Sequence, residues 1–486
     1  ISSGSDKCYV YFDKYNVAKI TNVTNTKTTN SVTLTVTTEA GENPIDKYYF
    51  SKDDGNSYQE STSQTYTFNE LTPNTTYTFK VYAKDTLGYE TNEESIEVTT
   101  NAYVNPIVNN VTVTDTTTSS ISVSVNASGG TNSVATYYYS INNGAYSSSS
   151  SNTKTFTGLS KGTTYTIKVY VKDTNGVDSS VKTTSAETSN PTFADTCREN
   201  GSNTLACYVA KLYTSQGTNG IYYHTSSLAN SAADNSYRYA GANPNNYVCF
   251  GSDAATCPSN NLYRIIGVFG SEVKLIKADY TTTTMTGSGG DYNGTYSSLT
   301  SSYKGSMNTS NIATYYWNNN TQTNTWSESR LNTTNLNSSY LSYIGTTWSN
   351  KIATHTWYVG GYSSSTATPK TFYNAESSGT TYSAKIGLMY VSDYGYAASP
   401  DNWSTTLYNY DNDTNRNNNW MFMGLYDWTI TRRSDDSSSA FYVYYTGNVS
   451  YFSVNNDFGV RPSFYLESSV VLSGGSGTSA DPYRIA

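Results

Sequence analysis

Side chains suited to ligand recognition are concentrated in residues 428–466. Tyrosine offers rigid amphipathic contact area, while serine and asparagine offer adjustable hydrogen bonds. Gly447-Asn448 in the middle predicts a tight turn with positive φ between two strands. Small or branched apolar residues would point inward: Ala440, Val443, Val449 and Val454. Large and polar residues would form an outer binding face: Tyr442, Tyr444, Tyr445, Tyr451, Phe452, Asn455, Asn456 and Asp457. The alternative is an ordinary exposed hairpin in a chain that is rich in tyrosine throughout.

Residues that could act in catalysis are few. The two histidines, His224 and His355, could serve as bases, but no nucleophile motif such as G-x-S-x-G accompanies either of them. A lone histidine is more often a hydrogen-bonding residue of the structure. We therefore expect that the protein is not an enzyme. A buried polar cluster with a strongly shifted pKa in a cleft would argue for the opposite conclusion.

Acidic residues at 411–415 alternate in the manner of calcium ligands, in the order Asp-Asn-Asp-Thr-Asn. The sixth position is Arg416 instead of Gly and the twelfth is Phe422 instead of Glu, so the run is not an EF-hand. A structural calcium ion remains an open alternative to the expectation of no cofactor. With two histidines and no Cys-x-x-Cys, a zinc site is not expected. Asp435, Asp436 and Ser437 lie beside Arg432 and Arg433, where the acidic side chains would form ion pairs instead of binding calcium.

Length and composition predict a secreted protein of several domains. The chain has 486 residues, 49 of them tyrosine, and 14% of its residues are charged. This length predicts two to four domains, and abundant Tyr, Thr and Val favour β-structure. A flexible mucin-like stalk is the alternative that the Ser, Thr and Asn content leaves open, but regular alternation of Tyr and Val argues against it.

Net charge and hydropathy restrict the kinds of partner that the chain could bind. A net charge of −8 without a basic cluster makes nucleic acid an unsuitable partner, because phosphate binding needs concentrated Lys and Arg. No apolar run approaches the roughly 20 residues of a membrane-spanning helix. We expect the extracellular part of a cell-surface protein, attached to the membrane only through a segment absent from this chain.

The five cysteines predict local disulfide bonds. Two spacings are short, which suggests that Cys197 pairs with Cys207 and Cys249 with Cys257, leaving Cys8 over. Spacing alone does not fix the pairing.

Two stretches of about 88 residues repeat one pattern of short strands. After a lead-in segment at 1–16, residues 17–101 alternate at Val32, Leu34 and Val36, then at Tyr48 and Phe50 and at Tyr66 and Phe68. About seven such strands separated by turns predict a β-sandwich. The run Leu71-Thr72-Pro73-Asn74-Thr75-Thr76-Tyr77 resembles the tyrosine corner of fibronectin type III domains, in which a Tyr hydroxyl fixes a loop between two strands.

The second copy occupies residues 102–190, with Leu159-Ser160-Lys161-Gly162-Thr163-Thr164-Tyr165 at the corner. A tandem array of this kind is most often a spacer, and neither copy contains Arg-Gly-Asp.

From Pro191 the pattern changes. Apolar residues at helical spacing predict a helix over Cys197–Leu212. Strands are expected at Leu262–Val268 and Val273–Lys277, and a helical piece near Thr333–Ile344 within a stretch, 280–380, that otherwise reads as loops packed on one another.

This C-terminal half resembles bacterial cell-surface domains related to the formylglycine-generating-enzyme type of the C-type-lectin fold. The resemblance is strongest over Trp428-x-x-x-Arg432, Ala440-Phe441-x-Val443, Thr446-Gly447-Asn448-Val449 and Gly459-Val460-Arg461-Pro462-x-Phe464-x-Leu466. It extends to Tyr237-Arg238-Tyr239, to Gly241 through Val248, to Leu262 through Phe269 and to Lys385 through Tyr390. The resemblance implies a mostly β, multidomain chain: two fibronectin type III-like β-sandwiches followed at 191–486 by an α+β C-type-lectin-like domain rich in loops. Such folds host unrelated functions.

The resemblance also implies roles for the final segment, because some proteins of this fold vary surface residues there on a fixed scaffold. The scaffold would be Trp428, Ala440, Val443, Gly447, Val449, Gly459, Arg461 and Pro462. The ligand-contact face would be Tyr442, Tyr444, Tyr445, Tyr451, Phe452, Ser453, Asn455, Asn456, Asp457 and Phe458. Since Tyr444 and Tyr445 are adjacent, one of them must face inward unless the turn begins there. The enzymes of this family use a cysteine pair in their C-terminal half, and no cysteine follows Cys257 here.

Two function classes follow. In the first, β-sandwich spacers present a C-terminal domain that binds an external protein or glycan. In the second, the chain is a structural subunit of a surface filament or layer that self-associates through its C-terminal domain.

Overall fold

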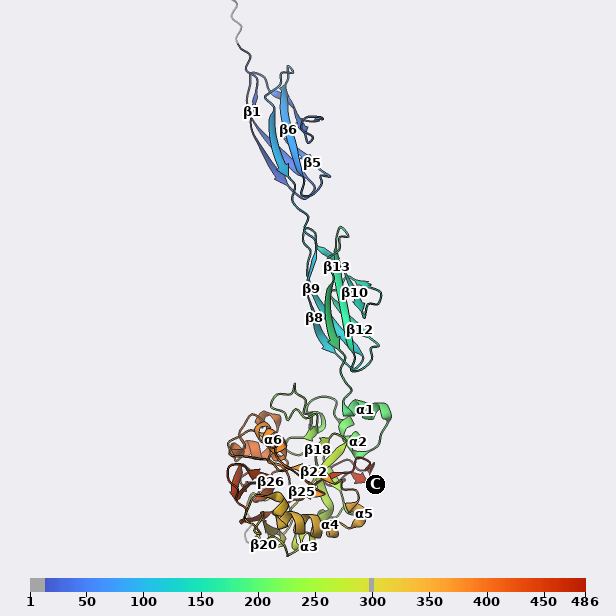
Figure 1. Ribbon diagram of the computed structural model, residues 1–486, viewed down its shortest axis with the longest axis vertical. Helices are drawn as coiled ribbons and strands as arrows, with labels where there is room; N and C mark the ends of the chain where they lie inside the picture. Colours follow the sequence, from blue (N-terminus) through green and yellow to red (C-terminus); the bar gives the residue numbers. More distant parts are fainter. Residues whose placement is uncertain (1–13, 297–300) are drawn as a thin grey trace, which may run out of the picture. The chain divides into compact units, whose positions relative to one another are not determined.

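The computed structural model describes residues 14–296 and 301–486 of a mostly β, multidomain chain (Figure 1). It divides into two compact units, one ending at Asn190 and the other beginning at Pro191. Most of the expected lead-in segment at 1–16, including Cys8, lies outside the described residues.

The first β-sandwich packs a three-stranded sheet against a four-stranded one. The first sheet has the order β1-β2-β5, with bounds Lys19–Lys27, Val32–Glu39 and Thr65–Phe68. The second has the order β4-β3-β6-β7, with bounds Gln59–Ser61, Ile45–Ser51, Thr76–Asp85 and Glu94–Thr99. The alternating residues of β2, β3 and β5 that the sequence marks as strand interiors include Val32, Leu34 and Phe50, which are fully buried in one core.

The second β-sandwich repeats this order. One sheet is β12-β9-β8, with bounds Thr153–Thr157, Ser120–Ser128 and Ile107–Thr116. The other is β11-β10-β13-β14, with bounds Ser147–Ser149, Val134–Ile141, Thr164–Asp173 and Lys182–Glu187. It has a separate core, centred on Ile121, Val123 and Ile167.

Both tyrosine corners are present. The Tyr77 hydroxyl accepts a hydrogen bond from the Thr72 backbone N–H at 2.9 Å. The Tyr165 hydroxyl accepts one from the Ser160 N–H at 2.8 Å. Both rings are half-buried. The same loop is therefore fixed in the same way in the two copies.

The C-terminal unit is built on two seven-stranded sheets. The strands of the first sheet have the order β15 (Ile221–Tyr223), β16 (Tyr237–Tyr239), β18 (Leu262–Phe269), β19 (Glu272–Lys277), β30 (Ser463–Leu466) and β25 (Ile386–Gly387). A seventh strand, β17 (Tyr247–Cys249), also pairs with β18. The strands of the second sheet have the order β20 (Tyr292–Thr295), β21 (Ala313–Tyr316), β29 (Asp457–Gly459), β26 (Asp427–Arg433), β27 (Ser439–Val443) and β28 (Val449–Ser453). A seventh strand, β23 (Gly361–Tyr362), also pairs with β26. Two-stranded sheets add β22 (His355–Tyr358) with β24 (Thr381–Ala384), and β31 (Leu472–Gly474) with β32 (Arg484–Ile485). The strands expected at 262–268 and 273–277 are confirmed as β18 and β19.

The single helix expected over Cys197–Leu212 is wrong. The structure has two helices, α1 (Phe193–Asn200) and α2 (Leu205–Leu212), each with its own threonine N-cap. Gly201 ends α1 with φ 64°, a left-handed conformation that glycine adopts without steric cost. The disulfide between Cys197 and Cys207 joins the two helices, and the second expected disulfide, Cys249–Cys257, is also present.

The stretch 280–380 is more regular than the expected packed loops. The helical piece near Thr333–Ile344 is confirmed as a π-helical segment, Leu331–Tyr340, followed by α4, Leu341–Ile344. Around it lie α3 (Thr283–Thr286), α5 (Thr346–Ser349) and α6 (Pro369–Ser377) as well as strands β20 to β23. Short helices α7 (Val391–Tyr396) and α8 (Asp413–Asn417) follow, and 3₁₀ turns lie at Thr218–Gly220, Ser259–Asn261, Thr309–Asn311, Trp326–Glu328, Pro400–Asn402 and Leu407–Asn409. The four tryptophans of the stretch are buried, so its short elements are held by a core that sequence periodicity does not reveal.

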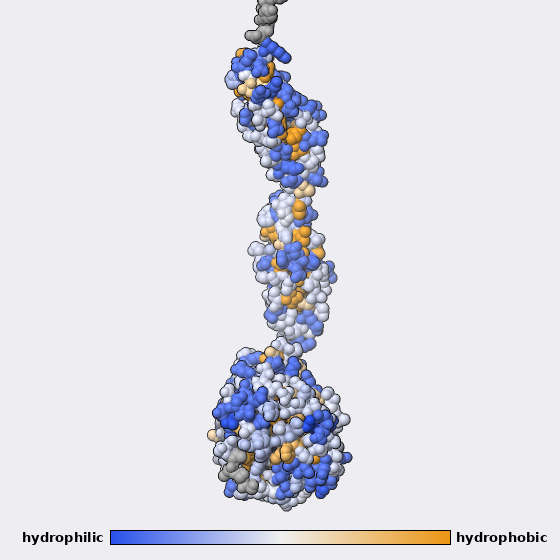
Figure 2. Space-filling model, turned by 90° about the vertical axis from the view of Figure 1, so that its left-hand side faces the viewer, coloured by the Kyte–Doolittle hydropathy of each residue, from blue (hydrophilic) through white to orange (hydrophobic). Residues whose placement is uncertain are grey.

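The surface of the C-terminal unit mixes polar and apolar residues. In Figure 2 its visible face is largely pale, which marks intermediate hydropathy, with scattered blue and orange. None of the helices in the described parts of the chain is long and apolar enough to cross a membrane.

Candidate functional site

Strands β27 and β28 form the expected hairpin. They pair antiparallel from Ser439 opposite Ser453 to Val443 opposite Val449. The Gly447 N–H donates to the Tyr444 carbonyl at 2.8 Å, and the Tyr444 N–H donates to the Asn448 carbonyl at 2.8 Å. The positive φ, 104°, falls on Gly447. Since the turn begins at Tyr444, the two adjacent tyrosines leave the strand alternation and neither has to face inward.

The expected scaffold of this segment is buried. The four inward-pointing residues, Ala440, Val443, Val449 and Val454, are almost without exposure, and so are Trp428 and Arg461. The Arg461 Nε donates to Asp427 Oδ2 at 2.6 Å, and its guanidinium also donates to the Met421 carbonyl at 2.8 Å. Asp427 Oδ1 has no hydrogen-bond partner among the described residues, and burial raises the pKa of this carboxyl to about 6. This ion pair ties the start of β26 to the segment after β29.

The expected ligand-contact face is divided, which corrects two of its members. Tyr442 is only 5% exposed and packs its ring on Trp428 and Phe458. Tyr451 lies on the opposite side of the sheet, where its ring meets Phe441. Successive residues of a strand point to opposite faces, so Tyr451 and Phe452 cannot share one. The prediction of one outer face that contains both Tyr451 and Phe452 is therefore wrong.

A continuous aromatic surface remains on the side of the sheet opposite Tyr451, and we call it the hairpin surface. It consists of Tyr426, Tyr444, Tyr445, Phe452 and Phe458. Tyr426 lies at the centre: its ring centroid is 5.0 Å from that of Tyr444, 5.6 Å from that of Tyr445 and 4.9 Å from that of Phe458. Phe452 lies at the edge, 6.4 Å from Phe458, and is 48% exposed.

Four members of the hairpin surface belong to the ten residues expected at the ligand, and Tyr426 was missed because it precedes the segment. The polar residues of the expected face lie around the β28–β29 turn. Asn455 is exposed, Asn456 donates to the Ser453 carbonyl at 3.3 Å, and Asp457 accepts from the Thr314 hydroxyl at 2.8 Å. The Asn456 side chain is thus bonded within the turn, and the Asp457 side chain is bonded to the neighbouring strand β21.

The acidic run at 411–415 forms a capped helical turn. The Asn412 side chain accepts from the Asn415 N–H at 2.8 Å and begins α8, and Asp413 pairs with Arg416. Within 14–296 and 301–486 no group of three or more His, Cys, Asp or Glu side chains is placed to hold a metal ion. Of the ion pairs expected nearby, Arg433 with Asp435 is present, with Nε 2.7 Å from the carboxylate. Arg432 instead donates to the Val359 carbonyl, and Asp436 accepts from Ser438 and Ser439.

Both histidines have structural contacts. His355 Nδ1 lies 2.9 Å from Glu272 Oε2, and its ring stacks on Tyr465 with centroids 3.6 Å apart. His224 Nδ1 accepts the Ala232 N–H at 3.2 Å. Burial holds the pKa of His224 well below its ordinary value, so this imidazole is neutral.

A buried charged network lies between the first sheet and α7, and no sequence motif marks it. Lys274 Nζ donates to Asp393 Oδ2 at 2.6 Å, and neither side chain is exposed to solvent. Arg238 donates to Asp234 Oδ2 at 2.6 Å, with Asp393 Oδ1 3.5 Å from its guanidinium. Buried charges are tolerated only when they are paired in this way.

Beside this network lies a cavity of about 230 Å³ with an unusual carboxyl group on its wall. Glu376 of α6 is 3% exposed. Its Oε1 accepts from the Thr431 hydroxyl at 2.5 Å and from the Ser392 N–H at 3.3 Å. Its Oε2 has no hydrogen-bond partner within the described parts of the chain. Burial raises the pKa of Glu376 to about 7. A polar cluster with a shifted pKa in a cavity, the feature that argues for catalysis, is therefore present here.

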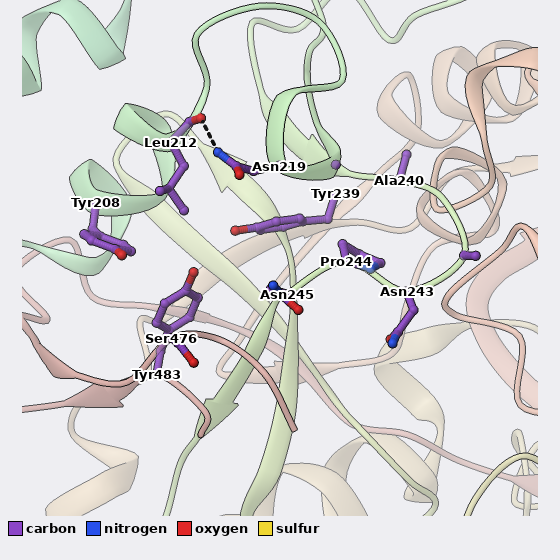
Figure 3. A pocket seen from close by; sticks show the side chains of 12 residues that line it. Tyr208, Leu212, Asn219, Tyr239, Ala240, Asn243, Pro244, Asn245, Ser476 and Tyr483 are labelled. Atoms are coloured by element: carbon purple, nitrogen blue, oxygen red, sulfur yellow. Dashed lines mark hydrogen bonds between the residues drawn. The ribbon is translucent and has the colours of Figure 1, made fainter. Parts of the chain in front are cut away.

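A second, wider pocket of about 520 Å³ is lined by aromatic rings and amides. Figure 3 shows the Tyr239 ring lying across it, with Tyr208 and Tyr483 on one side and Pro244 on the other. Tyr208 and Tyr483 meet edge to face, with centroids 5.5 Å apart. The loop that carries Pro244 also forms the wall of a neighbouring pocket of about 630 Å³, in which Arg264 lies over the Tyr247 and Trp420 rings.

Comparison with known proteins bears on the first sandwich. The fibronectin type III domain model matches residues 18–100. Residues 18–100 are a fibronectin type III domain. The fibronectin(III)-like modules of Clostridium thermocellum CbhA are 14% identical and match 35% of this chain and 95% of theirs, with a TM-score of 0.17. The central fibronectin-III array of RIM-binding protein is 18% identical and matches 37% of this chain and 71% of its own, with a TM-score of 0.16. No curated protein matches the chain.

Proposed function

We propose that this chain is part of an extracellular bacterial surface protein in which β-sandwich spacers present a C-type-lectin-like C-terminal domain to an external partner. Fibronectin type III domains commonly act as spacers or in adhesion, and together with disulfides they are typical of extracellular proteins. The resemblance of the C-terminal half to bacterial surface domains supports the remaining parts of the proposal.

The hairpin surface carries the proposal of binding. Its five rings contact one another over a scaffold fixed by the buried Arg461–Asp427 ion pair, and Phe452 exposes nearly half of its area. Tyr and Phe are enriched where proteins bind one another, and rigid rings lose little conformational entropy on binding. The partner favoured by this surface is a protein, with a glycan as the other outcome of a binding screen.

The test is a screen of the full chain against panels of extracellular proteins and glycans, repeated with Phe452→Ser and Tyr445→Ser. The matched control is Tyr343→Ser, since Tyr343 is 37% exposed on α4 outside the hairpin surface. The proposal expects a partner whose binding both hairpin variants weaken and the control leaves unchanged. Absence of any partner, or equal binding by all variants, would contradict it.

A structural subunit of a filament or layer is the second candidate, because another copy of the chain could cover the exposed Phe452. Electron microscopy of the purified chain separates the two. Regular polymers that disappear in Phe452→Ser favour self-assembly, and monodisperse particles favour an external partner.

Catalysis is not part of the proposal. Asp393 and Asp234 in the charged network are ion-paired with Lys274 and Arg238, so Glu376 has no second free carboxylate to act with it among the described residues that line its cavity. An acid–base mechanism requires groups free to exchange protons with a substrate.

A further inference from the structure

We propose that the cavity beside Glu376 binds a small organic cation that carries an ammonium group. The site differs from the hairpin surface, and nothing in the proposed function requires it. Four observations carry the inference: a free carboxylate oxygen, the charge balance, the aromatic walls and the size of the cavity.

The first observation is the unused oxygen of Glu376. Oε1 is occupied by the Thr431 hydroxyl and the Ser392 N–H, so the carboxyl group is held in one orientation. Oε2 belongs to the same buried side chain, which lines the cavity, and this oxygen has no hydrogen-bond partner in the described parts of the chain. Leaving a buried polar atom unpaired costs free energy, and a donor placed in the cavity would recover it.

The second observation is the charge around the carboxylate. The charged groups on the neighbouring elements have partners: Asp234 pairs with Arg238, and Asp393 pairs with Lys274 and Arg238. The Glu272 carboxylate lies 2.9 Å from His355 Nδ1. Glu376 lacks a counter-ion within the described residues, so an ionised Glu376 leaves the cavity with an excess negative charge. The complementary ligand is a cation.

The third observation is the aromatic lining. Tyr358, Tyr373, Tyr390 and Tyr465 line the cavity. The ammonium of Lys274 already lies 4.1 Å from the Tyr390 ring centroid and 5.2 Å from that of Tyr465, which shows how rings in this region accommodate such a group. Tyr358 is 44% exposed. Aromatic faces attract ammonium groups within about 6 Å, most strongly where water is excluded.

The fourth observation is size. About 230 Å³ is enough for an ammonium group with a short alkyl chain and too little for a folded segment or an oligosaccharide. A cation here would have to displace the proton from Glu376, whose pKa near 7 keeps the group largely protonated in mildly acidic solution. Binding is therefore coupled to pH.

The test uses n-propylammonium with the full chain, measured by isothermal titration calorimetry at about pH 6 and about pH 8. Only the ionised form of Glu376 binds, so the affinity should be about tenfold higher at the upper pH. Close to one proton should be released per ligand at about pH 6, and almost none at about pH 8. n-Propanol and propionate, which match the probe in size, should not bind.

Two variants make the result specific. Glu376→Gln keeps the shape of the side chain and should abolish binding of n-propylammonium at both pH values, together with proton release. Tyr358→Ala removes one exposed wall without changing charge and should weaken binding several-fold. Saturable binding by wild type that disappears in Glu376→Gln supports the site. No saturable binding by wild type, equal binding by Glu376→Gln, or binding of propionate would overturn it.

Discussion

Replacing Glu376 by Gln should stabilise the C-terminal unit by an amount that grows with pH. The carboxyl group of Glu376 is buried against α7 and β26, and burial raises its pKa from 4.5 to about 7. Its proton is therefore held in the folded state over a pH range in which the unfolded chain has already released it. Glutamine has the same shape and does not ionise, so it is free of this cost.

The magnitude follows from the linkage between proton binding and folding. Below about pH 4.5 both states of the wild type hold the proton, and its contribution to stability is fully present. As the pH rises toward about 7, only the unfolded chain is ionised, and the free energy of unfolding falls progressively. Above that pH both states are ionised and the loss is complete. The interval corresponds to about 3 kcal/mol, since one pKa unit is worth about 1.4 kcal/mol.

Urea unfolding followed by tryptophan fluorescence measures this change in the intact chain. All seven tryptophans lie between Trp317 and Trp428, so the signal reports the C-terminal unit and not the sandwiches. The quantity to compare is the difference between variant and wild type at about pH 4.5 and about pH 8. Any constant cost of the glutamine amide cancels in that comparison, and so does the titration of Asp427, which both proteins share. A difference that does not change with pH would refute the burial of an ionisable Glu376.

Three further predictions concern the rest of the chain. Tyr77→Phe should lower the stability of the first sandwich by about 1 kcal/mol, because the loop N–H loses its acceptor; an unchanged calorimetric transition would remove the tyrosine-corner assignment. Selective reduction of Cys197–Cys207 should cost roughly 2–3 kcal/mol by the loop-entropy estimate, measured by tryptophan-detected urea unfolding, and no loss would show that α1 and α2 are held by packing alone. Tyr442→Ala should cost about 3–5 kcal/mol because the ring is buried, whereas Phe452→Ala should stay within about 1 kcal/mol; equal effects in thermal melts would contradict the division of the hairpin.

The sandwiches were predictable because their signals are local. Alternating apolar residues define each strand, and the corner motif places Tyr77 five residues after the N–H that it accepts. Both patterns occur twice at the same spacing, so the second copy supports the first. The short disulfide loops belong to the same class, since nearby cysteines need little chain ordering to meet.

The prediction of one helix over Cys197–Leu212 is wrong because a single residue, Gly201, ends the first helix. Leu205, Val209 and Leu212 have helical spacing and do form α2, but the pattern cannot show that the chain reverses before it. Gly201 ends α1 in the left-handed region, and Thr204 then caps a new helix. A glycine followed within a few residues by threonine was the available signal for that break.

The hairpin itself was predicted correctly. The residues of its predicted binding face lie on two sides of the sheet, because successive residues of a strand point to opposite sides. The pairing register places Phe452 opposite Ala440 and Tyr451 opposite Phe441. Residue type alone suggested that every large aromatic side chain faces out. Alternation requires half of them to pack inside, and in this chain tyrosine serves as core material as readily as it serves at the surface.

The Glu376 cavity could not have been predicted, because its parts come from elements far apart in the sequence. Arg238 lies on β16, Lys274 on β19, Glu376 on α6 and Asp393 on α7. Each stands in an unremarkable local pattern, and only the fold places the ion pairs so that one carboxylate oxygen is left over. Asp234 and Asp393 are paired with Arg238 and Lys274, and Glu376 is left without a basic partner. The cavity therefore favours a cation, and no single segment of the sequence shows this preference. A charge surplus of this kind is a property of tertiary structure, and the pH dependence of Glu376→Gln stability tests it without any ligand in hand.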